Sequence, residues 1–148
     1  MIGSVEQSRL IQFIRSGGGL YLEGNDLYKD HRNTALSDYL PGTFGGDGRG
    51  AWLGNISRVE GPEGTVVQGF VFKFPQWGHA DEAPDEIIQG ENDTVLLTCQ
   101  KGHVRVLATG PMNQYNVVAS SVMFGVLRQG EKHRSLDTLM QRYLKFLF

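Results

Sequence analysis

Cysteine is almost missing from this sequence, which has one thiol, Cys99, among 148 residues. A single cysteine excludes an internal disulfide and any zinc site built from several cysteines, and it does not indicate a compartment. No apolar run is long enough to cross a bilayer, and the first ten residues hold no apolar core of signal-peptide length. We therefore expect no membrane insertion and no signal peptide within this chain.

An excess of positive charge is also absent. Fourteen Lys and Arg against sixteen Asp and Glu give a formal net charge of −2. Such a balance provides no general attraction for nucleic acid, so we expect no nucleic-acid partner. A length of 148 residues with 40% hydrophobic content suits one domain, which we place at residues 1–148.

Glycine, in contrast, is abundant. Its 20 copies are about twice the usual share of roughly 7%. Eight of them lie between residues 42 and 64, among apolar side chains that need burial. This distribution predicts an irregular β insertion around residues 42–90, made of loops and short strands.

The N-terminal pattern predicts a helix followed at once by a strand. Apolar residues recur at helical spacing up to Ser16, Ser4 can serve as N-cap, and the glycines at 17–19 can supply a left-handed stop. In the strand LYLEG, residues 20–24, Leu20 and Leu22 should face one side and Tyr21 the other.

Later segments predict one short helix, four strands and a last helix. The short helix is expected at 33–40, and the strands at 65–75, 94–99, 103–109 and 115–121. After a cap at Ser135, apolar residues form a single helical stripe: Leu136, Leu139, Met140, Tyr143, Leu144 and Leu147.

This order predicts an α/β layered domain with a mixed sheet. A crossover helix normally follows a parallel strand, whereas here the first helix has few residues before it. Either the sheet is small and mostly antiparallel, or the chain is the C-terminal part of a larger domain; we favour the second alternative.

Two segments, residues 10–40 and 103–147, resemble class I glutamine amidotransferase-like domains, especially the non-catalytic kind found in large secreted bacterial proteins. The shared features are a helix, a glycine pair, a strand and a G-x-D turn, and then a closing strand pair and helix. The resemblance covers roughly half of the chain. It implies the C-terminal portion of a flavodoxin-like three-layer fold that lacks its first strands.

Catalytic members of that family carry a cysteine on a glycine-flanked elbow, together with a His and a Glu. Here the turn after residues 20–24 carries Asn25 and Asp26, and the late strand ends in Ser120 and Ser121, so no catalytic residue carries over. Cys99 ends a predicted strand without a glycine elbow, which is typical of a small structural residue.

The glycine-rich turns do not predict phosphate binding. Residues 17–19 precede a strand and lack the Lys and Ser/Thr of a P-loop, so they indicate a helix C-cap. The segment GGDGRG, residues 45–50, offers the single carboxylate of Asp47, too few oxygens for calcium. We expect no cofactor and no metal.

The strongest candidate site follows the strand at residues 20–24, where open α/β sheets bind ligands. Its side chains could act as acid and base or hold a metal; alternatively Asn25 and Asp26 form an Asx turn and His31 lies on the surface. The candidate ligand-binding residues, with the two late serines, are Glu23, Asn25, Asp26, Asp30, His31, Ser120 and Ser121.

Two further clusters favour ordinary structural interpretations. Carboxylates in WGHADEAPDE could attract calcium but lack EF-hand spacing, so we expect a solvated loop for His79, Asp81, Glu82, Asp85 and Glu86. An aromatic group could stack on sugars, although alternating phenylalanines usually form core: Trp52, Phe70, Phe72, Phe74 and Trp77.

Together these patterns favour a non-catalytic interaction or scaffold module of a larger, exported bacterial protein. Its partners would be other domains of that parent protein or a second copy of the chain. The alternative is a hydrolase or metal-dependent enzyme that uses the loop at 23–31. An enzyme would need three groups in one pocket: Asp26 or Asp30, His31, and Ser120 or Ser121. A scaffold has no such requirement.

Overall fold

The computed structural model describes residues 1–47, 56–74, 84–110, 112–129 and 135–148. Its helices are α1 (Ser4–Arg15), α2 (Leu27–His31) and α3 (Leu136–Leu147), with the 3-10 helices η1 (Ala35–Tyr39) and η2 (Phe124–Val126). Its strands are β1 (Leu20–Glu23), β2 (Thr43–Gly46), β3 (Arg58–Glu60), β4 (Val71–Lys73), β5 (Glu86–Ile88), β6 (Thr94–Cys99), β7 (Val104–Ala108), β8 (Val117–Ser120) and β9 (Arg128–Gln129).

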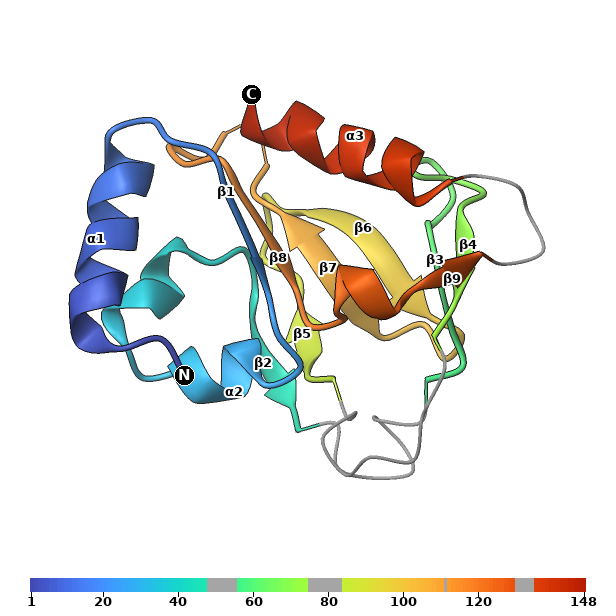
Figure 1. Ribbon diagram of the computed structural model, residues 1–148, viewed down its shortest axis with the longest axis horizontal. Coiled ribbons are helices and arrows are strands. Elements are labelled where there is room, and N and C mark those ends of the chain that lie inside the picture. Colours follow the sequence, from blue (N-terminus) through green and yellow to red (C-terminus); the bar gives the residue numbers. More distant parts are fainter. Residues whose placement is uncertain (48–55, 75–83, 111, 130–134) are drawn as a thin grey trace.

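These strands form one curled, mixed sheet (Figure 1). Its main order is β1-β8-β7-β6-β3-β4-β9, and β5 also pairs with β7 and with β2. Strands β1 and β8 are parallel, with Leu20 opposite Val117, and the other recorded pairs are antiparallel. The mixed α/β class is thus confirmed. The predicted segment at 42–90 contributes β2 to β5 to the same sheet.

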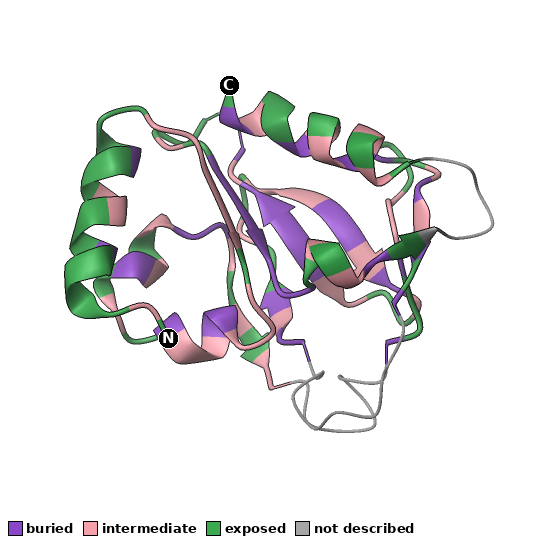
Figure 2. Cartoon of the chain, viewed as in Figure 1, coloured by how far each residue is buried: buried purple, intermediate pink, exposed green. Residues whose placement is uncertain are grey.

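The two faces of the sheet carry two apolar clusters. One cluster packs beneath α3, and the other packs against α1, α2 and η1. As predicted, Tyr21 belongs to the α3 face, whereas Leu20 and Leu22 belong to the opposite face. Figure 2 shows the buried residues concentrated in the central strands between these helices.

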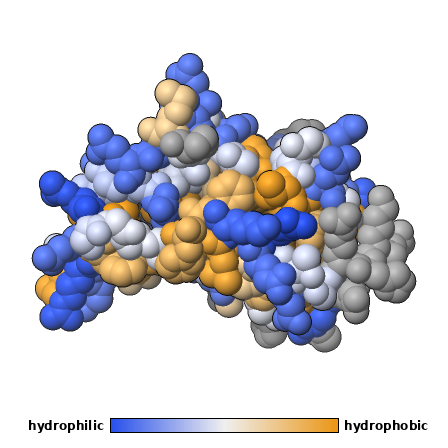
Figure 3. All heavy atoms as spheres, turned by 90° about the horizontal axis from the view of Figure 1, so that it is seen from above, coloured by the Kyte–Doolittle hydropathy of each residue, from blue (hydrophilic) through white to orange (hydrophobic). Residues whose placement is uncertain are grey.

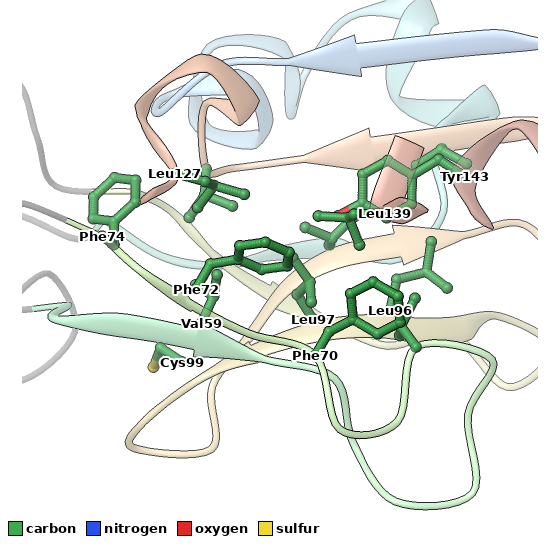
Figure 4. Close-up of a cluster of buried hydrophobic side chains, with 14 of the residues drawn as sticks. Val59, Phe70, Phe72, Phe74, Leu96, Leu97, Cys99, Leu127, Leu139 and Tyr143 are labelled. Atoms are coloured by element: carbon green, nitrogen blue, oxygen red, sulfur yellow. The ribbon is translucent and has the colours of Figure 1, made fainter. Parts of the chain in front are cut away.

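Three alternating phenylalanines dominate the cluster under α3 (Figure 4). Phe70, Phe72 and Phe74 are all buried, together with Leu139 and Tyr143 from α3. The expectation that they form core is confirmed. Trp52 and Trp77 lie outside the described residues.

The turn between α1 and β1 has the predicted glycine C-cap. Gly17 has a φ of +91°, and the amide of Gly18 donates to the carbonyl of Phe13 at 3.0 Å. A Cβ on Gly19 would lie 2.4 Å from the carbonyl oxygen of Leu147, so the turn packs closely against the end of α3. The N-cap prediction was wrong by one residue, because Gly3 is the N-cap and Ser4 begins the helix.

Three other local predictions require correction. The strand predicted at 65–75 is confirmed only as β4, because residues 66–69 form a turn in which Gly69 has a φ of +78°. The helix predicted at 33–40 is the 3-10 helix η1, and the loop predicted at 23–31 contains the short helix α2. In α2, Leu27, Tyr28 and His31 are buried on one side, but a helix of five residues is too short to display a period.

The last helix is confirmed with one exception. Ser135 caps α3 by accepting a hydrogen bond from the Thr138 amide at 3.2 Å. Leu139, Tyr143 and Leu147 are buried, whereas Leu144, which was expected in the same stripe, is 41% exposed. Successive residues are turned by about 100°, so Leu144 lies beside the buried row at 139, 143 and 147.

The face that includes α3 mixes apolar and polar side chains. Figure 3 shows apolar side chains gathered in its middle, with hydrophilic side chains around them. Among the described residues, no helix combines the length and the apolar character needed to cross a bilayer.

Candidate functional site

The segment that follows β1 lines a groove of about 340 Å³. Residues from the N-terminus and from β1 complete its walls. Five of the seven candidate residues therefore meet in one hollow: Glu23, Asn25, Asp26, Asp30 and His31.

His31 is buried in this groove rather than lying on the surface. Its Nε2 accepts a hydrogen bond from the Ile2 amide at 3.2 Å, which fixes the imidazole against the start of the chain. Burial lowers the pKa of His31, and this loss of solvation outweighs the opposing effect of Asp30. The ring is therefore a neutral acceptor at physiological pH.

Glu23 ties β1 to the segment before β9. Its Oε2 accepts from the Tyr21 hydroxyl at 2.7 Å and from the Phe124 amide at 2.8 Å. The Tyr21 ring stacks on Tyr143 of α3, with centroids 5.8 Å apart. Burial, followed by the Glu23 contact, raises the pKa of Tyr21, so its hydroxyl stays protonated and donates.

The two late serines do not line the groove. The Ser120 hydroxyl donates to the carbonyl of Val122 at 2.5 Å, and the Ser121 hydroxyl donates to the carbonyl of Arg105 at 3.3 Å. By strand alternation Ser120 shares the α3 face with Val118, whereas His31 lies with α2 on the opposite face. The structure therefore separates Ser120 from His31.

Asp26 lies close to two other carboxylates, a proximity that the sequence did not predict. Carboxylate oxygens of Asp26, Asp47 and Asp85 all lie within 4.8 Å of one another. Asp47 directly follows β2 and Asp85 directly precedes β5, and Gly46 pairs with Glu86 across these two strands. The antiparallel pair thus brings the two carboxylates to the α2 segment.

Lys29 provides the positive charge in this group. Its ammonium lies 2.6 Å from Asp47 Oδ2 and 3.7 Å from Asp26 Oδ1. Asp26 occupies the N-cap position of α2 without capping it through its side chain. The Asx-turn interpretation therefore does not describe how the Asp26 carboxylate is used.

Asp85 is the buried member of the group, with 0% of its surface exposed. Its amide donates to the carbonyl of Asn25, and its Oδ2 accepts from the Lys29 amide, each at 2.8 Å. Burial is the main reason that the pKa of Asp85 rises to about 6; Asp26 and Asp47 raise it further. The prediction that Asp85 lies in a solvated loop is wrong.

Sequence reasoning missed Lys29, Asp47 and Asp85 as site residues. A signal for Asp85 was present, because it follows Ala83 and Pro84 and precedes an apolar pair that begins at Ile87. Glu86, also expected in a solvated loop, instead begins β5, and its Oε1 lies 2.6 Å from His103 Nδ1. His79, Asp81 and Glu82 lie outside the described residues.

Cys99 is a buried core residue. Its sulfur lies at the edge of the apolar cluster in Figure 4, and the Arg105 guanidinium donates to it at 3.8 Å through Nη2. A buried thiol in this position is suited to packing.

Comparison with models of known protein families, with curated proteins and with solved structures found no match to this chain. The resemblance to amidotransferase-like domains therefore stays a prediction.

Proposed function

We propose that this chain is a non-catalytic interaction module, and that it associates with a second copy of itself through the outer edge of β1. The observation that carries the proposal is that β1 ends the sheet, with its recorded pairing on one side, to β8. Its residues are half-buried or exposed, whereas every residue of β8 is buried. A strand with one open edge is a template for another strand.

The direction of the backbone groups follows from the pairing. The Leu20 amide donates to Asn116 and the Gly24 amide donates to Ser120, so residues 20, 22 and 24 direct their amides to β8. Because backbone groups alternate along a strand, Tyr21 and Glu23 direct theirs outward. Neither Lys nor Pro, the usual protection of an edge, interrupts β1.

A two-fold axis through Leu22 fits these groups. Tyr21 of one copy would then lie opposite Glu23 of the other, each pair exchanging both backbone hydrogen bonds. Leu22 would meet Leu22 of the second copy on the α1 face. The four residues of β1 are thus self-complementary in one antiparallel register.

Apolar side chains at both ends of β1 can extend this contact. At the start of β1, Phe13 is 49% exposed and lies against Gly18. At the end of β1, Met123 is 42% exposed and precedes Phe124, whose amide donates a hydrogen bond to Glu23. An antiparallel arrangement brings the Phe13 end of one copy to the Met123 end of the other. Such contacts are needed because a stable interface buries about 1,200 Å² or more.

The positions of the serines weigh against the alternative hydrolase. Their hydroxyls donate to backbone carbonyls and do not line the groove that holds His31. An acyl-transfer site requires its nucleophile within hydrogen-bond reach of its base.

The proposal is tested by sedimentation equilibrium from micromolar to near-millimolar protein. We expect a monomer–dimer equilibrium for the wild type. Glu23→Pro removes the outward amide and should shift the equilibrium to monomer, whereas Glu23→Ala removes the same carboxylate, keeps the amide and should still dimerise. A monomeric wild type, or equal association of the two variants, would contradict the proposal.

A further inference from the structure

The three carboxylates beside α2 converge from separate parts of the chain. Asp26 is the N-cap of α2, Asp47 follows β2 and Asp85 precedes β5, with their oxygens within 4.8 Å of one another. Like charges at this separation repel, so a fold that holds them together requires positive charge between them. Lys29 supplies an ammonium that contacts Asp47 and Asp26.

Asp85 is incompletely satisfied. Its Oδ2 accepts from the Lys29 amide, but its Oδ1 is fully buried and has no hydrogen-bond donor in the part of the chain that the structure describes. Buried carboxylate oxygens are normally hydrogen-bonded or coordinate a metal, because an unpaired one loses its solvation without compensation. This oxygen belongs to the carboxylate that faces Asp26 and Asp47.

The spacing of the oxygens favours one class of cation. Two oxygens on opposite sides of Ca²⁺ are separated by about 4.6–5.2 Å, given Ca–O distances of about 2.3–2.6 Å. Mg²⁺, with distances of about 2.0–2.1 Å, allows at most about 4.2 Å. The three oxygens all lie within 4.8 Å of one another, inside the span that Ca²⁺ bridges. Mg²⁺ usually keeps several waters and is bound through one or two carboxylates, whereas three carboxylates suit Ca²⁺. Carboxylates on three segments also permit the flexible geometry that Ca²⁺ accepts.

We propose that Asp26, Asp47 and Asp85 bind a divalent cation, with Ca²⁺ preferred over Mg²⁺. The cation would link the start of α2 to the adjoining ends of β2 and β5. This site is independent of the edge of β1.

Lys29 competes with the cation in this proposal. Its ammonium lies among the same oxygens as a tethered monovalent cation, and its side chain is 29% exposed, so it can swing toward solvent when Ca²⁺ enters. The energy of displacing Lys29 reduces the affinity. Replacement of Lys29 by an uncharged side chain should therefore strengthen Ca²⁺ binding.

The test is calorimetric titration of metal-free protein with CaCl₂, and separately with MgCl₂, at neutral pH. We expect saturable Ca²⁺ binding with a dissociation constant below about 10 mM. This limit is set above the range of weak calcium sites, about 10⁻⁴–10⁻³ M. Mg²⁺ should bind at least tenfold more weakly. Saturating Ca²⁺ should also raise the melting temperature by a few degrees, because the ligand binds the folded state.

Four variants identify the ligands. Asp47→Asn and Asp26→Asn, at partly exposed positions, should each weaken Ca²⁺ binding at least tenfold, and Lys29→Met should strengthen it several-fold. Asp38→Asn makes the same charge change at an exposed position on η1 and should bind as the wild type does. The proposal fails if neither the wild type nor Lys29→Met binds Ca²⁺ in this range, or if Asp47→Asn binds as tightly as Asp38→Asn.

Discussion

At the scale of single residues, Asp85 should give the protein a measurable pH dependence. Burial raises its pKa from an ordinary value of 3.8 to about 6, so the folded state holds this proton more tightly than the unfolded chain does. Its contribution to the free energy of unfolding is therefore most favourable below about pH 4, falls as the pH rises to about 6, and is then constant. The full change is at most about 3 kcal/mol.

Urea denaturation of the wild type and of Asp85→Asn, without divalent cations, measures this effect. The stability difference, wild type minus variant, should decrease by up to about 3 kcal/mol between about pH 4 and about pH 6. Because the pKa of His31 is lowered in the folded state, its protonation on acidification destabilises the protein. This effect is the same in the wild type and in the variant, so it cancels in the stability difference. A difference that stays constant with pH would show that Asp85 titrates normally.

The candidate site could be predicted in part from single residues. Asp26 was identified because polar residues after a strand end mark the usual ligand position of an α/β sheet. Asp47 and Asp85 do not stand out within their own segments, because Asp47 is a single carboxylate and the segment of Asp85 lacks EF-hand spacing. Only the pairing of β2 with β5 brings Asp47 and Asp85 together, and a short strand with two glycines, such as β2, carries little sign of its partner.

At the scale of elements, α3 offers a matched pair of leucines. Leu139 is 0% exposed and Leu144 is 41% exposed on the same helix. Leu139→Ala should lower the free energy of unfolding by about 2–5 kcal/mol, because it leaves a cavity in the core. Leu144→Ala should cost less than about 1 kcal/mol. Chemical denaturation of both variants checks this, and equal losses would place the two side chains in similar surroundings.

The elements that could be predicted show a helical period or an apolar run with clear boundaries. Helices α1 and α3 fall close to their predicted positions because each repeats its apolar pattern, and strands β6 to β8 do so because each is an apolar run between turn residues. The short elements α2, β2, β3 and β5 have three to five residues, and their conformation depends on contacts with the rest of the sheet. The prediction that Leu144 is buried was wrong for a related reason. An apolar stripe in the sequence does not show which side chains at its margin are covered.

At the scale of the whole molecule, the mixed α/β class was predictable and the curled sheet was not. A helix before the first strand and another after the last indicated layers on a sheet, and each of these helices covers a different face. The direction of the strands depends on which distant segments pair. Only β1 and β8 among the recorded pairs run parallel, and the hairpin-like connection of β6 and β7 accounts for part of the antiparallel remainder.

Amide hydrogen exchange should reveal the pattern of the β1 edge residue by residue. The amides of Leu20, Leu22 and Gly24 face β8, so they should exchange slowly at any protein concentration. The amides of Tyr21 and Glu23 face outward and should exchange fast in dilute protein.

If two copies pair in the register centred on Leu22, the Tyr21 and Glu23 amides should become protected as the concentration rises. Their protection should follow the dimer fraction measured by sedimentation, because each donates to the second copy only in the dimer. In Glu23→Pro, which cannot complete that pair, the Tyr21 amide should stay fast at every concentration. Slow exchange of Tyr21 and Glu23 in the most dilute wild type would mean that another part of the chain already covers this edge.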